Sequence, residues 1–288
     1  MKLITLSGGL GNQMFQYAFY TALKKSGQRR VYLYKNKILK HRDHCGYELQ
    51  KLFHIEDSDK GMWLTRLLQT PVFGPFLKHL LFPRKIKERV QYDYDAYRRY
   101  TEADTPYGIH MVGYWQSERY FERAAREVRR AFTFDERMLT PATLACLRQM
   151  TNRQTVSIHV RRGDFFHPDF VKMFGGVCTV DYYTRAIKHI QKHVPTPRFY
   201  VFSDDLDWAR DHLPLPENTV WVDWNSGADS WQDMFLMSKC KHNILANSSF
   251  SWWGGWLNEN PDKIVIAPAV WARSIPTPDI TPKHWTRL

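Results

Sequence analysis

The 288-residue sequence contains few cysteines and no long apolar run. Its four cysteines are scattered with no CxxC pair, which is typical of a reduced cytoplasmic protein rather than of a disulfide-rich or zinc-binding domain. No stretch of about 18 apolar residues occurs, so we expect no transmembrane helix. The opening residues, MKLITLSGGLGNQ, turn to glycines and polar residues too soon for a signal peptide. We therefore expect a cytoplasmic protein.

Two familiar catalytic motifs are also missing. The sequence has no GxxxxGK[ST], which disfavours a P-loop kinase or ATPase, and no GxSxG, the usual mark of an α/β-hydrolase. Asp204 and Asp205 are adjacent, yet no further carboxylate or histidine follows at the spacing of a metal site. The residues therefore give no sign of a metal ion or other cofactor.

Acidic residues are too few to balance the basic ones. Lysine and arginine number 41 against 29 aspartates and glutamates, which gives a net charge of +12. Residues 1–150 hold 26 of these bases and 15 of the acids, whereas residues 151–288 hold 15 and 14. A basic half suits nucleic acid, an anionic membrane or an anionic substrate, or is simply a solvated surface. Nucleic acid is disfavoured because the sharpest motifs lie in the nearly neutral half.

The order of apolar and polar segments predicts an α/β protein. Hydrophobic residues make up 43% and aromatic residues 15% of the chain, as in a folded globular protein. The chain opens as a strand, a glycine-rich turn, a helix (MFQYAFYTALKKSG) and a second strand. Strands and helices then alternate after residue 150, which predicts two α/β halves with parallel sheets. The strands expected in the second half are 155–160, 198–203, 219–222, 243–246 and 263–268.

Polar residues gather where these strands end, which is where parallel sheets bind ligands. Arg161 and Arg162 follow one strand and supply guanidinium groups suited to a diphosphate, or they form a structural Arg–Asp pair. Asp204 and Asp205 follow the next strand; they accept hydrogen bonds from a purine, act as a base, or cap the following helix with Ser203. The GGLGNQ turn suits the close approach of an anion, or is a tight turn without a ligand.

The segment NSSFSWWGGW (247–256) joins an expected strand to an expected helix. Asn247, Ser248 and Ser249 lie at the helix entry, where backbone N–H groups and small hydroxyls favour a phosphate. Trp252, Trp253 and Trp256 share a helical face, which favours a core position over a platform for stacking sugars.

A basic amphipathic stretch lies at residues 61–90. It predicts peripheral contact with an anionic membrane, at its inner face. The alternative is an ordinary helical insertion.

Six segments, in this order along the chain, resemble one known family, the bacterial alpha-1,2-fucosyltransferases of glycosyltransferase family 11. The resemblance runs from residue 8 to residue 258 and is specific in combination; residues 40–100 and the C-terminal tail carry none of its motifs. The segments are GGLGNQMFQYAF (8–19), GYWQSERYF (113–121), HVRRGDF (159–165), GVCTVDYY (176–183), VFSDD (201–205) and NSSFSWWGGWLN (247–258).

The resemblance implies a GT-B-like fold of two Rossmann-type domains facing each other across a cleft. Residues 1–150 are then the acceptor-side domain, and residues 151–288 bind GDP-fucose. The implied reaction is a metal-independent, inverting transfer of L-fucose from GDP-β-L-fucose to the 2-hydroxyl of a terminal β-galactose. The acceptor is an oligosaccharide or a lipid-linked glycan, such as an O-antigen precursor. The alternative is a related enzyme with another GDP-sugar donor or another acceptor linkage.

The same resemblance assigns roles to individual residues. Arg161 binds the β-phosphate and neutralises the charge of the leaving GDP, and His159 with Asp204 or Asp205 holds guanine or ribose. Asp164 is the first candidate for the base that takes the acceptor proton; His167, Asp169 or a dissociative reaction without a strong base are the alternatives. Trp115, Gln116, His167 and Asp169 are the expected acceptor contacts. The expected donor contacts are Gly11, Asn12, Gln13, His159, Arg161, Arg162, Ser203, Asp204, Asp205, Asn247, Ser248, Ser249 and Phe250.

Overall fold

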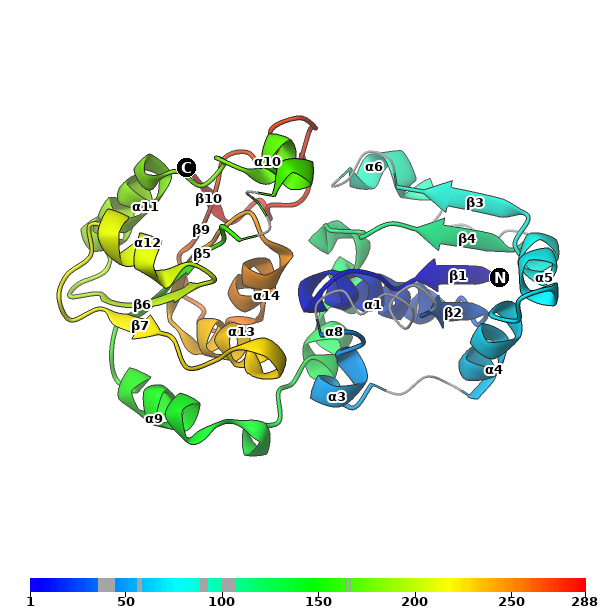
Figure 1. Cartoon of the computed structure of the whole chain (residues 1–288), viewed down its shortest axis with the longest axis horizontal. Helices are drawn as coiled ribbons and strands as arrows, with labels where there is room; N and C mark the ends of the chain where they lie inside the picture. The colour runs from blue at the N-terminus through cyan, green and yellow to red at the C-terminus, as the bar shows by residue number, and fades with distance from the viewer. Residues whose placement is uncertain (36–44, 56–58, 89–92, 100–106, 164, 166) are drawn as a thin grey trace. The chain divides into compact units, whose positions relative to one another are not determined.

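The computed structural model describes all residues except 36–44, 56–58, 89–92, 100–106, 164 and 166 (Figure 1). The chain forms two compact units. The first comprises Met1–Asp135 with Pro278–Ile280, and the second comprises Glu136–Thr277 with Thr281–Leu288. None of the helices in the described part of the chain has both the length and the apolarity needed to cross a bilayer.

The change from the first unit to the second falls at residue 135, whereas the sequence placed it near residue 150. The reason is the packing of α9 (Pro141–Met150), which contacts α13 (Trp231–Lys239) of the second unit. The Thr140 N–H donates to Gln232 Oε1 at 2.9 Å, and Thr143 Oγ1 donates to Asn225 Oδ1 at 3.1 Å. These bonds join residues far apart in the chain, so no local pattern announces them.

The first unit is built on a parallel sheet with the strand order β2-β1-β4-β3. Helix α1 follows β1 because Met14, Ala18 and Phe15, Phe19 recur at helical spacing and are buried, as the sequence predicted. The strands are β1 (Lys2–Thr5), β2 (Val31–Tyr34), β3 (Arg84–Lys87) and β4 (Ile109–Val112). The helices are α1 (Leu10–Lys25), α3 (Leu49–Phe53), α4 (Asp59–Leu68), α5 (Phe73–Leu81), α6 (Tyr94–Tyr97) and α8 (Ala125–Ala131), with short 3-10 turns at Glu118–Tyr120 and Glu122–Ala124.

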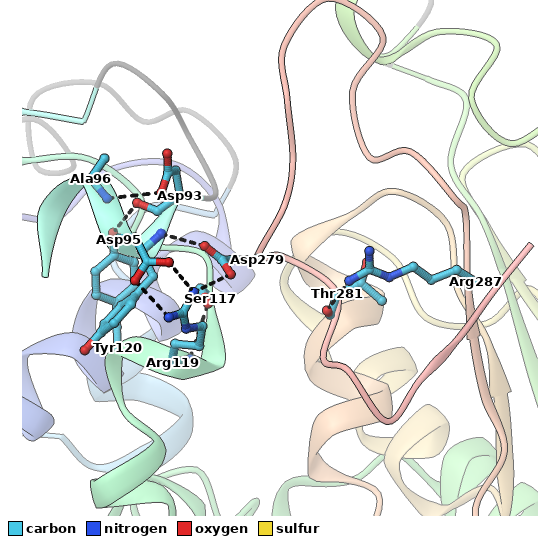
Figure 2. Close-up of polar contacts among 10 residues, drawn as sticks. Asp93, Asp95, Ala96, Ser117, Arg119, Tyr120, Asp279, Thr281 and Arg287 are labelled. Carbon is cyan, nitrogen blue, oxygen red and sulfur yellow. Dashed lines mark hydrogen bonds and ion pairs between the residues drawn. The ribbon is translucent and has the colours of Figure 1, made fainter.

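Three residues from the C-terminal region, 278–280, belong to this first unit. The Asp279 carboxylate accepts the Tyr94 N–H at 2.8 Å and lies 2.7 Å from Nη1 of Arg119 (Figure 2). Arg119 also forms an ion pair with Asp95 at 2.9 Å, and its guanidinium lies over the Tyr94 ring. The chain therefore returns to the first unit after forming most of the second.

The second unit contains a six-stranded parallel sheet with the order β10-β9-β8-β5-β6-β7. Its central strand β5 is buried at every residue, as expected for a parallel sheet covered on both faces. The strands are β5 (Thr155–Val160), β6 (Arg198–Ser203), β7 (Val220–Val222), β8 (His242–Ile244), β9 (Val265–Ala267) and β10 (Thr286–Arg287). Besides α9 and α13, the helices are α10 (Pro168–Phe174), α11 (Val180–His193), α12 (Leu206–His212) and α14 (Ser249–Leu257), with 3-10 turns at Glu136–Met138 and Gly227–Asp229.

The helices of the second unit cover both faces of its sheet. Val156 and Ile158 of β5 point to one face, where they join one apolar cluster with Tyr183 and Ile187 of α11. On the other face, Asn243 of β8 donates to Ser157 Oγ and to a backbone carbonyl of α13. This α/β architecture is the one predicted from the sequence, and it brings the carboxyl ends of β8, β5 and β6 to one edge.

Candidate functional site

The predicted basic and acidic residues meet at the carboxyl ends of β5 and β6. Parallel pairing places Val160 opposite Ser203, so the residues that follow the two strands emerge side by side. Arg161 Nη1 lies 3.0 Å from Asp204 Oδ2, and the Arg162 N–H donates to Asp204 Oδ1 at 2.8 Å. The expectation that these strand ends form one cluster is thus met by the geometry.

The Asp204 carboxylate holds the turn that follows β5. It accepts the Gly163 N–H at 3.0 Å as well as the bonds from the two arginines. A Cβ at position 163 would lie only 2.8 Å from Asp204 Oδ2, so this approach favours glycine there. The Asp204 carboxylate thus has three donors around it, and its contact with Arg161 orients that side chain. This is the Arg–Asp pair that the sequence offered as the structural alternative.

Arg162 is fixed by a second aspartate and by a tryptophan that the sequence did not single out. Its Nε lies 2.9 Å from Asp205 Oδ2, and its guanidinium lies 4.1 Å from the centre of the Trp208 ring. Asp205 also accepts the Trp208 N–H and so caps α12, while the Ser203 hydroxyl accepts the Asp205 N–H. The hydrogen bond from Arg162 lowers the pKa of the Asp205 carboxyl, which keeps it ionised.

His159 is a buried neutral imidazole beside this cluster. Burial, with a smaller contribution from the charge of Arg161, lowers its pKa to about 3. Its ring centre lies 5.9 Å from that of Phe250, the second residue of α14. Among the described residues its Nδ1 atom, which is buried, has no hydrogen-bond partner.

Asn247 anchors the loop between β8 and α14. Its Nδ2 donates to the carbonyl oxygens of Phe174 and Trp271, at 3.2 and 3.1 Å, and its Oδ1 accepts from the Cys178 thiol. The side chain is buried. Asn247 therefore positions the helix entry from within the protein.

The N-terminus of α14 presents backbone donors at the same edge of the sheet. Ser248 is the N-cap, and its hydroxyl accepts the Phe250 N–H at 3.3 Å. The first-turn amides of a helix have no carbonyl four residues back within the helix, and the helix dipole favours a negative charge there. Ser249 is the first helical residue and is half-buried. The arrangement is suited to a phosphate group.

The tryptophans of α14 are core residues, as their spacing indicated. Trp252 and Trp253 are fully buried, and Trp256 packs against both. Gly254 allows α13 to approach closely, because a Cβ there would lie 2.8 Å from Met237 Cβ. The indoles thus brace α14 and offer no sugar-stacking platform.

The donor contacts expected from the first unit lie at the start of α1. Gln13 is buried, and its Nε2 donates to the carbonyls of Gly8 and Gly46 at 3.0 and 2.8 Å. Its Oε1 accepts the Glu48 N–H. The Gln13 amide therefore fixes the backbone of this region. Gly11 is buried, and the carbonyl oxygen of the Asn12 side chain accepts a hydrogen bond from Gln116. A donor contact for Gly11, Asn12 and Gln13 stays a prediction.

Glu48 is a buried acid that no sequence motif indicated. Its carboxylate accepts the Leu10 N–H at the first turn of α1. Burial raises its pKa to about 7, although Lys51 and the Leu10 N–H act in the opposite direction. The segment that carries Glu48 matches none of the family segments, so only the fold reveals its position.

Trp115 occupies the core of the first unit. Its indole is fully buried and is stacked on Phe19 with ring centres 4.7 Å apart. Its backbone N–H donates to the buried carboxylate of Glu88, as does that of Tyr114. A buried indole has no face for a sugar, so the acceptor contact expected of Trp115 is replaced by a packing role. Gln116 is buried as well.

The base candidates are only partly described. Asp164 lies outside the described residues, and Asp169 belongs to α10. His167 is exposed just before α10, with its ring 6.4 Å from that of Phe170. Within the described ranges, no three His, Cys, Asp or Glu side chains gather as a metal site. Independence from metal stays a prediction.

Comparison with known proteins identifies the family. The model of "Glycosyl transferase family 11" matches residues 77–287. The chain belongs to glycosyltransferase family 11. Over 98% of its length it is 31% identical to an alpha-1,2-colitosyltransferase of Escherichia coli, covering 97% of that protein. It is 32% identical, again over 98% of its length, to the O-antigen biosynthesis glycosyltransferase WbnK of Escherichia coli, covering 99% of it.

A more distant relative and two solved structures are also similar to this chain. The galactoside alpha-(1,2)-fucosyltransferase 1 of Ateles belzebuth is 24% identical over 87% of this chain and 63% of its own length. Two crystal structures of the fucosyltransferase NodZ, one of the protein from Bradyrhizobium and one soaked with GDP-fucose, give TM-scores of 0.52 and 0.53. Each is 13% identical and covers 88–89% of this chain and 92% of NodZ. The family 11 chain thus has the predicted GT-B-like fold.

Proposed function

We propose that this family 11 enzyme transfers L-fucose from GDP-β-L-fucose to the 2-hydroxyl of a terminal β-galactose. The acceptor is an oligosaccharide or lipid-linked glycan of the O-antigen type, and the reaction proceeds in the cytoplasm with inversion and without a metal ion. The similarity to alpha-1,2-transferases over nearly the whole chain supports the linkage and the reaction. The similarity to WbnK supports an O-antigen acceptor.

The cluster at the carboxyl ends of β5 and β8 carries this proposal. Arg161 is oriented by Asp204, and the first turn of α14 presents backbone amides at the same edge of the sheet. Both features attract a diphosphate, one through a guanidinium fork and the other through N–H groups and the helix dipole. The rings of His159, which precedes Arg161 by two residues, and Phe250 of this first turn have centres 5.9 Å apart and are suited to the nucleoside or the adjoining phosphate.

The chemistry requires charge stabilisation more than covalent help. The bond between the sugar and the β-phosphate breaks, its electron pair leaves with GDP, and the sugar acquires oxocarbenium character. Arg161 and the α14 amides stabilise the negative charge that develops on the leaving diphosphate. The acceptor 2-hydroxyl attacks the opposite face of the sugar, which inverts the configuration, and its proton passes to a base.

Asp164 is the proposed base because only Gly163 separates it in the chain from the two arginines that we propose for the diphosphate. His167 and Asp169 lie a few residues further along and are the next candidates. With Asp164→Asn, turnover falls while GDP affinity is retained if the proposal is right. If His167→Gln has the larger effect on turnover, the histidine takes this role.

A second donor has a specific observation in its favour. One relative of nearly the same length is named an alpha-1,2-colitosyltransferase, so nucleotide-activated colitose is the alternative to GDP-fucose.

A transfer assay tests the proposal. The purified chain is incubated with GDP-fucose or GDP-colitose and a panel of β-galactosides, with and without excess EDTA. The products are identified by mass spectrometry. We expect fucosylated galactosides from GDP-fucose at a rate that EDTA does not change. Transfer from GDP-colitose but not from GDP-fucose would make GDP-colitose the donor. A loss of activity in EDTA that Mn²⁺ restores would contradict the metal-free reaction.

A further inference from the structure

In the connection between β2 and β3, the helices α4 and α5 carry apolar residues on two sides. On the inner side, Leu64 and Leu68 of α4 pack with Leu3 of β1 and Phe82 in one buried cluster. This packing explains the inner apolar residues as part of the core of the first unit. It leaves the outer apolar residues without a structural role.

The outer side of these helices is unusually apolar for a solvated surface. Trp63, Val72, Phe73, Phe76 and Leu80 have exposed fractions of 62–77%. They are five of the eight large hydrophobic residues that are exposed in the described part of the chain. Phe73, Phe76 and Leu80 have the i, i+3, i+7 spacing of one helical face, where a solvated helix carries polar side chains. Exposed apolar residues gathered on two contacting helices are typical of a binding surface.

Basic residues accompany this apolar patch. From residue 60 to residue 87 the sequence contains six lysines and arginines and no aspartate or glutamate. The exposed ones include Arg66 on α4 and Arg84, Lys85 and Lys87 on β3, the edge strand of the sheet. Charged residues on an edge strand also prevent pairing with another chain, but this role does not account for the aromatic residues beside them.

We propose that the outer surface of α4, α5 and β3, formed by Trp63, Val72, Phe73, Phe76 and Leu80 with the exposed cations of α4 and β3, docks on an anionic lipid bilayer. Its aromatic and leucine side chains enter the boundary between headgroups and acyl chains, and the cations contact the anionic headgroups. A second copy of the chain fits poorly, because a two-fold contact would bring two basic surfaces together.

The position of this surface in the first unit is compatible with catalysis. Figure 1 shows α4 and α5 near the end of the sheet where β1 begins, and α1 follows the other end of that strand. The residues at the start of α1, such as Asn12, therefore lie away from the proposed lipid contact. The inference is independent of the proposed transfer reaction, since its test uses no donor sugar.

Vesicle co-sedimentation tests the inference with the full chain. The vesicles are phosphatidylcholine alone or with about one third phosphatidylglycerol, at about 0.05 M and about 0.5 M salt. We expect the wild-type protein to sediment with the anionic vesicles at low salt, and at least about tenfold less with neutral vesicles or at high salt. No binding to anionic vesicles at low salt, or equal binding to both lipids, would overturn the inference.

Matched variants separate the two components of the surface. The triple variant Phe73→Ser, Phe76→Ser, Leu80→Ser removes apolar contact, and Lys85→Glu with Lys87→Glu reverses charge; each should weaken anionic-vesicle binding at least about tenfold. Circular dichroism checks that both fold, and either variant alone suffices for the test if the other does not fold. The controls in the second unit are Val270→Ser and Lys188→Glu with Lys192→Glu, which should bind as the wild type does.

Sedimentation velocity without lipid tests whether a second copy of the chain occupies this surface instead. We expect a monomer in both the wild type and the apolar triple variant. A wild-type dimer that the triple variant converts to a monomer, with vesicle binding unaffected by that variant, would assign the patch to self-association and overturn the inference.

Discussion

Arg161 makes the charged contact on which the proposed chemistry depends. Its guanidinium is held by Asp204, and its side chain remains 29% exposed, so it can meet a ligand. We expect Arg161→Ala to reduce transfer by a factor of hundreds or more, as removal of one group that stabilises transition-state charge usually does. Steady-state kinetics measure the loss. Near-wild-type turnover in the purified, folded variant would remove Arg161 from the mechanism.

An arginine elsewhere in the second unit serves as the control. Arg148 of α9 is exposed and lies outside the cluster, so Arg148→Ala should keep full activity. Arg161→Lys separates charge from shape, because lysine keeps the charge and loses the fork. We expect its activity to lie between those of Arg161→Ala and the wild type.

The buried carboxyl of Asp233 makes the free energy of unfolding depend on pH. Burial raises its folded-state pKa to about 7, while Asn225 donates to its carboxyl. Near its unfolded pKa of about 3.9 and below, both states are protonated, and Asp233 has little effect. As the pH rises toward 7, only the unfolded state loses the proton, so the free energy of unfolding falls; above about 7 the loss is complete. Chemical denaturation between pH 5 and pH 8 follows this trend.

The substitution Asp233→Asn isolates the contribution of this residue. The amide oxygen can still accept from Asn225, and no charge is buried at high pH. We expect the variant to be more stable than the wild type at pH 8 and its advantage to shrink toward pH 5. The pKa of Glu48 is also raised to about 7, so this residue lowers the free energy of unfolding over the same pH range. Its contribution is the same in the variant and the wild type and cancels in their difference. A variant less stable than the wild type at pH 8 would contradict this account.

Parallel strand pairing explains why Arg161 and Asp204, which the sequence places at two strand ends, are neighbours. Arg161 and Asp204 are 43 positions apart in the sequence, but consecutive parallel strands bring them together. The role of Trp115 could not be predicted, because a tryptophan in a short motif suits a core and a sugar site equally. Its burial depends on Phe19 and Tyr120, which approach it only in the folded unit.

At the scale of elements, α14 separates donor binding from stability. Ser249 is its first residue, a position where proline is tolerated, and Ser248 before it is extended as proline requires. Ser249→Pro therefore removes one N–H from the proposed phosphate site with little change in the helix. We expect roughly tenfold weaker GDP binding by calorimetry, since a hydrogen bond to a charged group contributes about 1.5–3 kcal/mol.

Two further substitutions in α14 complete this comparison. Ser249→Ala keeps the backbone N–H and should bind GDP almost as the wild type does. Trp253→Ala opens a cavity in the core and should cost about 3–5 kcal/mol of unfolding free energy. Unchanged GDP affinity in Ser249→Pro would show that this amide does not contact the donor.

The sequence predicted the elements of the second unit more fully than those of the first. Apolar runs ending in polar turns located β5 and β6, whose predicted bounds match the structure. The edge strand β3 escaped prediction because RKIK lacks the apolar content of a strand. It forms by pairing with β4, which no local pattern encodes.

At the scale of the whole molecule, the 278–280 segment adds two covalent crossings between the units to the one that follows residue 135. Asp279 accepts the Tyr94 N–H and pairs with Arg119, and its side chain is only 13% exposed. We expect Asp279→Ala to lower the unfolding free energy of the first unit by about 1–3 kcal/mol, because the part-buried Tyr94 N–H loses its acceptor and Arg119 loses an ion-pair partner. Urea denaturation measures this change.

Asp95 provides the control for this contact. It pairs with the same Arg119 but is 62% exposed, so Asp95→Ala should cost less than about 1 kcal/mol. Equal effects of the two substitutions would mean that the 278–280 segment adds no more stability than a surface ion pair. The sequence could not reveal this return to the first unit, because three residues carry no periodic pattern.

The linkage and configuration of the product test the central claim most directly. After incubation with GDP-fucose and a β-galactoside, nuclear magnetic resonance of the purified product reports the anomer and the linked carbon. We expect an α-linked fucose on the 2-oxygen of galactose. A β-linked sugar, a different linked carbon, or no transfer while the same protein transfers another GDP-sugar would contradict it.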